Sequence, residues 1–108
     1  MRDNKPSSTA NERAWTTWVA EQWGATPEYR TFDGSRVDVL TDTHAWEVEW
    51  VKKWQEAIGQ SLYYAAATNR RPAILLLTRG KPTEEVYYLR CLTTCMVAGI
   101  ELQTLRTT

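Results

Sequence analysis

Two segments near the middle of the chain alternate between apolar and polar residues, which is the pattern of half-buried β-strands. They span residues 35–41 and 45–51, and the connection at Asp42 and Thr43 is short enough for a hairpin turn. A shorter segment, residues 28–32, precedes them across an Asp-Gly pair, another turn signal. The three segments therefore predict an antiparallel meander.

Three other segments place apolar residues at helical spacing. The first should be capped by Ser8 or Thr9, because Glu12 completes a capping box with Thr9. In the second, one stripe (Trp54, Ile58, Leu62 and Ala65) suits packing on a sheet. The predicted helices span about residues 9–22, 53–68 and 82–98.

Residues 72–78 are almost continuously apolar, as in a strand buried on both faces, and residues 100–105 predict a last strand. The resulting order, αβββαβαβ, predicts an α/β fold in which a central mixed sheet is flanked by helices on both sides. With 108 residues, the chain should form one domain, residues 9–108, after a flexible tail of residues 1–8.

Charge and cysteine content narrow the function only slightly. The 13 basic and 13 acidic residues cancel, which argues against a binder that is held to nucleic acid by net charge alone. Cys91 and Cys95 lack the further ligands of a zinc site and are interpreted as buried free thiols in a reducing compartment. Neither a signal peptide nor a membrane span is recognisable, so we expect a cytoplasmic protein with no membrane partner.

Three acidic residues interrupt the apolar pattern of the central strands: Asp38, Glu47 and Glu49. Residues two apart point to the same face of a strand, and antiparallel pairing would bring Asp38 opposite or diagonal to Glu47. A carboxylate in such a place must be paired or bound to something positive. Three of them repel one another, so a cation is the natural partner, and oxygen ligands suit Mg²⁺.

Structural interpretations compete with the metal site. Asp38 could pair with Arg36 or Arg30, and Glu47 and Glu49 could form the solvated face of a hairpin. The following helix carries a polar stripe that begins where the acidic strand ends: Lys53, Glu56, Gln60 and Tyr63. Tyr63 and Tyr64 are interpreted as packing residues.

Three short motifs in this order resemble those of a known family. Arg36-Val-Asp38 is similar to the first acidic motif of the PD-(D/E)XK nuclease superfamily, which has the restriction-endonuclease-like fold. Glu47-Val-Glu49 stands where that family has an acid, any residue and then lysine, and the segment from Gln60 to Tyr64 is similar to its glutamine-tyrosine helix. The resemblance covers roughly residues 12–105.

The resemblance implies a metal site. Asp38 and Glu47 would hold Mg²⁺, for which Mn²⁺ could substitute. Glu12 on the first helix would add an outer carboxylate, with Glu21 as the alternative. Glu49 would orient a lysine or hold a second ion.

It also implies residues that act on the substrate. Because Glu49 occupies the usual lysine position, Lys53 is the best candidate for a lysine that has moved to another element, and Lys52 is the next. Lys53 would position or help deprotonate the attacking water, and Gln60 would fix a water or a phosphate. The cations expected to contact nucleic acid are Arg36, Lys52 and Lys53.

The function implied is a magnesium-dependent DNA endonuclease of a phage or bacterial cell, in which a homodimer would place two sites on two strands. A small domain has little surface for reading sequence, so structure-selective cutting is expected. Two alternatives stay open. One is a catalytically inactive module of the same fold that binds nucleic acid or protein, and the other is an enzyme that uses an acidic metal cluster on a small molecule.

Overall fold

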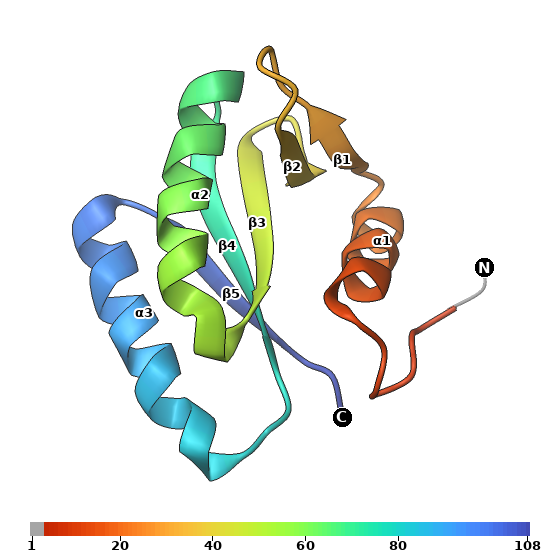
Figure 1. The fold of residues 1–108 in the computed structure, drawn as a ribbon, viewed down its shortest axis with the longest axis vertical. Helices are drawn as coiled ribbons and strands as arrows, with labels where there is room; N and C mark the ends of the chain where they lie inside the picture. Colours follow the sequence, from red (N-terminus) through yellow and green to blue (C-terminus); the bar gives the residue numbers. More distant parts are fainter. Residues whose placement is uncertain (1–3) are drawn as a thin grey trace.

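The computed structural model describes residues 4–108 and has the predicted order of elements (Figure 1). These are α1 (Glu12–Trp23), β1 (Thr26–Arg30), β2 (Arg36–Leu40), β3 (His44–Trp50), α2 (Trp54–Thr68), β4 (Arg71–Thr78), α3 (Glu85–Ala98) and β5 (Glu101–Arg106). Short 3₁₀ turns, Val51–Lys53 and Pro82–Glu84, lead into α2 and α3. Of the predicted tail, residues 1–3 lie outside the described residues, and residues 4–8 form neither helix nor strand.

The five strands form one mixed sheet in chain order, β1-β2-β3-β4-β5. The first three strands are antiparallel, as the meander predicted, and β3, β4 and β5 are parallel. The β1–β2 turn is closed by the N–H of Thr31, which donates to the carbonyl of Ser35 at 2.8 Å. Gly34 in this turn has φ of 87°, a conformation that favours glycine.

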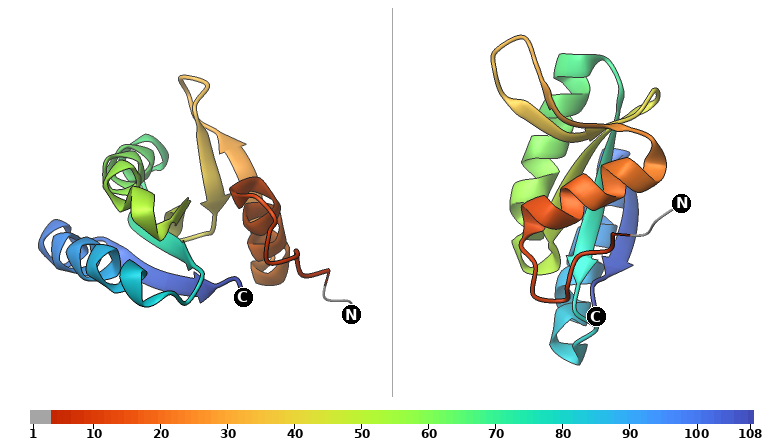
Figure 2. Two further views of the ribbon diagram at one scale, coloured as in Figure 1. Left: turned by 60° about the horizontal axis from the view of Figure 1, so that its bottom comes forward. Right: turned by 90° about the vertical axis from the view of Figure 1, so that its right-hand side faces the viewer.

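Helices cover both faces of the sheet, as predicted (Figure 2). Helix α1 packs on one face through Trp15 and Val19, against Val48 and Leu75. Helices α2 and α3 cover the other face, where Ile74 and Leu76 are buried with the free thiols Cys91 and Cys95. Residues 73–77 of β4 alternate between the two clusters, which shows why this part of the strand is apolar at every position.

Three boundaries or faces differ from the sequence-based prediction. Asn11, rather than Ser8 or Thr9, caps α1, since its side chain accepts the N–H of Ala14 at 2.9 Å. Strand β1 ends at Arg30, because residues 31–35 form the turn. The buried stripe of α2 is Ala57, Ser61 and Ala65, whereas Leu62 is 42% exposed, so the helix is rotated from the predicted orientation.

Candidate metal centre

The sheet opens between β2 and β3 at the level of the acidic residues. Strand β2 pairs with β3 only at Val39–Trp46 and Leu40–Ala45, whereas its pairing with β1 continues to Arg36. Just beyond the last pair, the Asp38 carboxylate accepts the N–H of Val48 at 2.9 Å. A side chain therefore replaces a backbone hydrogen bond here, and it holds the carboxyl group inside the opening.

Four carboxyl groups from three elements meet in this opening. Asp38 of β2 shares a side-chain hydrogen bond with Glu47 of β3. Glu12 of α1 shares another with Glu49 of β3. Glu47 and Glu49 are only 4% and 7% exposed, so the competing interpretation of a solvated strand face is wrong. Asp38 and Glu47 therefore lie side by side, as antiparallel pairing predicted, and their binding of one cation stays a prediction.

The electrostatic cost of this arrangement appears in the pKa values. Burial, followed by the charge of Asp38, raises the pKa of Glu47 from 4.5 to about 10. Burial and the hydrogen bond with Glu49 raise the pKa of Glu12 to about 8. Burial also raises the pKa of Asp38, although the Val48 N–H acts against it. Without a cation, the cluster therefore retains protons at neutral pH.

One oxygen in the cluster has no partner. The Glu47 Oε1 atom is buried and, within residues 4–108, accepts no hydrogen bond. A buried polar atom without a partner costs roughly 1–3 kcal/mol, which a ligand at this atom would offset. In the same part of the chain, no group of three or more His, Cys, Asp or Glu side chains is already arranged around a metal position. The carboxyl groups are instead turned toward each other in two pairs.

A cavity of about 350 Å³ gives access to the cluster from the side of α1 and the β1–β2 hairpin. Its wall contains an ion-pair bridge, in which Glu28 binds Arg36 at 2.9 Å and Arg13 at 3.5 Å. Glu12, Asp38 and Tyr64 are also in the lining, together with Thr16, Gly34 and Ser35. Arg36 thus balances Glu28, and the predicted alternative in which it pairs with Asp38 is not what the structure shows.

Of the predicted lysines and glutamine, only Lys53 acts on the cluster. Lys53 is exposed in the turn before α2, and its charge lowers the pKa of Glu12. Lys52 is also exposed, beside a small separate hollow at the end of β3. Gln60 is exposed on α2, and it is Tyr64, one helical turn later, that reaches the cavity. Lys53 thus reaches the cluster through its charge alone, and Gln60 is not among the residues that line the cavity.

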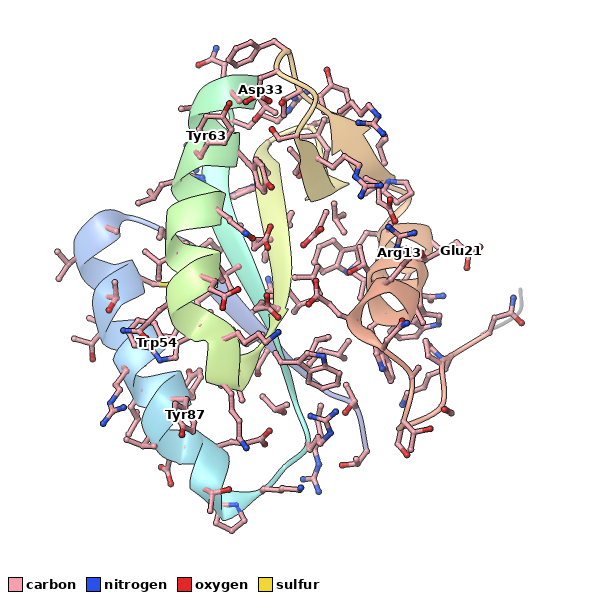
Figure 3. All side chains as sticks on the ribbon, viewed as in Figure 1. Arg13, Glu21, Asp33, Trp54, Tyr63 and Tyr87 are labelled. Atoms are coloured by element: carbon pink, nitrogen blue, oxygen red, sulfur yellow. The ribbon has the colours of Figure 1, made fainter. Side chains whose placement is uncertain are left out.

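Between the two glutamates proposed for α1, the structure selects Glu12. Glu21 is exposed, and Figure 3 shows it on the side of α1 away from the sheet. Glu12 lies in the first turn of α1 and interacts with Glu49, Asp38 and Lys53. The start of α1 therefore adds a carboxyl group to the acidic cluster.

Tyr64 is the lining residue that the sequence interpretation missed. Burial, then the charges of Glu47 and Asp38, raise the pKa of its phenol, so it stays a neutral hydrogen-bond donor. Its neighbour Tyr63 instead donates to Asp33 at the tip of the β1–β2 hairpin (Figure 3). The available signal was the spacing of four residues from Gln60, which puts Tyr64 on the same side of α2.

No protein-family model matches this chain, and no curated protein or solved structure shows significant similarity to it. None of the helices in residues 4–108 is long and apolar enough to cross a membrane. The fold and the geometry of the acidic cluster are thus the basis for a functional conclusion.

Proposed function

We propose that the chain is a magnesium-dependent DNA endonuclease of the PD-(D/E)XK type. The observation that carries this proposal is that four carboxyl groups, from α1, β2 and β3, interact in one cluster and that one of them, Glu47, has a buried oxygen without a partner among the described residues. A buried acidic cluster without a cation is unfavourable unless it binds one or keeps its protons. The opening between β2 and β3 and the adjoining cavity supply access for a phosphodiester.

The residues present fit a hard divalent cation. Asp38 and Glu47 would hold it directly, and Glu12 would add a further carboxylate, because all three offer carboxylate oxygens. Binding would displace the protons that the cluster retains, so affinity should rise with pH. When bound, Mg²⁺ would make a water more acidic and offset negative charge on the phosphoryl oxygens.

The other residues would handle the water and the substrate. Lys53 would orient the attacking water and offset phosphate charge, since its positive charge already acts on Glu12. Glu49, which is hydrogen-bonded to Glu12, would fix that carboxyl group in place. The neutral phenol of Tyr64 would donate to a phosphate oxygen in the cavity, and Gln60 would assist from the same side of α2.

One observation favours the inactive binding module as the second candidate. Lys53 is exposed, and within residues 4–108 it forms no ion pair with any carboxyl group of the cluster. Glu49, at the position where the family has its lysine, accepts the N–H of Trp50 at 2.8 Å. A site with acids but without a lysine in contact could bind a cation and nucleic acid without hydrolysis.

Cleavage assays separate the two candidates. Supercoiled plasmid and a four-way DNA junction should be incubated with Mg²⁺, with Mn²⁺ and with a chelator. The wild-type protein should nick or cut one of them with either metal, and Glu47→Gln should abolish the activity. Glu21→Gln is the matched control, because it makes the same chemical change on the exposed side of α1. Absence of cleavage by the wild type with both metals would exclude the nuclease and leave the binding module.

A further inference from the structure

The parallel strands β3, β4 and β5 end on the same side of the sheet (Figure 1). Five exposed cations lie at or just after these strand ends in the sequence. We call this group the cationic rim: Lys52, Lys53, Arg79, Lys81 and Arg106. Lys52, Arg79 and Lys81 line one hollow of about 70 Å³. The Arg106 guanidinium lies against Gly80, between Arg79 and Lys81.

The charges of the cationic rim are not neutralised locally. Within residues 4–108, no rim cation has a carboxylate within ion-pair distance. Glu84 lies in the same hollow but is buried, and its carboxylate accepts the backbone N–H groups of Arg79 and Lys81 at 3.0 and 3.1 Å. Two exposed acids also lie close to the rim, Glu56, four residues after Lys52, and Glu85, which shares a second hollow with Lys81, but in the described part of the chain neither forms an ion pair with a rim cation. The rim thus has an excess of positive charge although the chain has none.

Two of the rim guanidinium groups are held in place. The Arg79 guanidinium stacks on the Trp50 ring, 3.9 Å from its centroid. Arg106 occupies the space where any side chain at position 80 would begin, so the glycine is required for its position. Its Nε also donates to the Thr108 hydroxyl at 3.3 Å. An oriented guanidinium loses less entropy when it binds a phosphate.

We propose that the cationic rim binds the phosphate backbone of the nucleic acid and directs a strand toward the carboxyl cluster. The inference rests on the proposed nuclease or nucleic-acid-binding function and adds the surface by which the substrate is held. Lys53 joins the two regions, because it belongs to the rim and its charge also reaches Glu12. The acidic residues lie between β2 and β3, and the cations lie apart from them in the cationic rim. This separation would let a chain of zero net charge hold a polyanion.

The opposite, N-terminal end of the parallel strands provides a matched control. Arg70 lies there just before β4, and Arg71, which is exposed, is the first residue of that strand. Arg70 donates to the carbonyl of Asp42 at 3.3 Å. Removing these two charges changes net charge by the same amount as removing Arg79 and Lys81, but it leaves the cationic rim intact.

The test is the salt dependence of DNA binding, measured by fluorescence anisotropy with a chelator present, from about 50 to about 200 mM salt. A labelled duplex is titrated with wild type, Arg79→Ala/Lys81→Ala and Arg70→Ala/Arg71→Ala. The slope of log affinity against log salt should fall by about 2 for the rim variant, since each lost phosphate contact removes about 0.9. The control variant should keep the wild-type slope, and thermal melting should show that both variants are folded.

Equal slopes for the wild type and the rim variant would overturn the proposal. An equal decrease of the slope in the control variant would overturn it too. Because the measurement is made without metal, its result is independent of cleavage. A lower salt slope for the rim variant of a protein that never cuts DNA would support DNA binding by the rim and exclude the nuclease. Cleavage by the wild type together with an unchanged slope for the rim variant would support the nuclease and exclude DNA binding by the rim.

Discussion

The Asp38 carboxylate accepts the N–H of Val48 at 2.9 Å, at the point where β2 no longer pairs with β3. Asp38 therefore has a structural task as well as a place in the acidic cluster. Asp38→Asn keeps a carbonyl oxygen for this hydrogen bond, whereas Asp38→Ala leaves a buried N–H without a partner, at a cost of roughly 1–3 kcal/mol. We expect urea unfolding to show this loss for Asp38→Ala relative to Asp38→Asn. Equal stability of the two variants would mean that the hydrogen bond contributes nothing.

The metal-free protein should become less stable as the pH rises. The pKa values of Glu12 and Glu47 are raised on folding from 4.5 to about 8 and about 10, so between these limits the folded state retains protons that the unfolded chain has released. The stability that these two protonated carboxyl groups contribute is complete below the pKa values of the unfolded chain. It is lost as the pH rises through the pKa values of the folded state. Urea unfolding from about pH 5 to about pH 9 with a chelator should show the decline.

Glu47→Gln is the control for this pH dependence, because an amide does not titrate. It should flatten the decline in the metal-free protein, while Mg²⁺ should flatten it in the wild type by binding the ionised carboxylates. A wild-type stability that does not change over this range would contradict the raised pKa values.

Lys53 and its neighbour Lys52 should differ in their effect on cleavage. Lys53 acts electrostatically on Glu12, so Lys53→Ala should lower the cleavage rate by about a hundredfold, in the range for a group that assists proton transfer. DNA affinity should change little, because one phosphate contact is a small share of the total. Lys52→Ala should cut at close to the wild-type rate. A normal rate for Lys53→Ala, or loss of activity only in Lys52→Ala, would show that the role is assigned to the wrong residue.

Tyr64→Phe removes the one phenol that lines the cavity among the described residues. If this hydroxyl binds a phosphate oxygen, the variant should cut DNA about tenfold more slowly, which corresponds to a hydrogen bond to a charged group of roughly 1.5 kcal/mol. Tyr63→Phe is the matched control, because its hydroxyl binds Asp33 on the hairpin instead. Similar rates for the two variants in a single-turnover cleavage assay would argue against a role for Tyr64.

The order of elements followed from the sequence because each segment carries a clear periodicity and is bounded by glycine, proline or a turn pair. The acidic residues of β2 and β3 were also visible, since a carboxylate in an apolar strand is conspicuous. The sequence did not show that Asn11, rather than Thr9, caps α1. Both residue types can cap a helix, and the Glu12 carboxyl group that would complete a capping box is engaged with Glu49 instead.

The rotation of α2 was equally hidden, because it depends on tertiary packing. Small residues at positions 57, 61 and 65 let the helix approach the sheet closely, and this orientation turns Tyr64 rather than Tyr63 toward the cavity. The separation of β2 from β3 is a property of how the two strands pair, which alternation within β2 cannot reveal. The cationic rim joins residues that are far apart in the sequence, and only the sheet brings them together.

Calorimetric titration with Mg²⁺ or Mn²⁺ at about pH 8 tests most directly whether the carboxyl cluster is a metal site. The wild type and Glu21→Gln should bind the cation with release of protons, and Glu47→Gln and Asp38→Asn should lose most of the affinity while remaining folded. Wild-type affinity in both of the latter variants, or no binding by the wild type, would contradict the assignment of Asp38 and Glu47 as metal ligands.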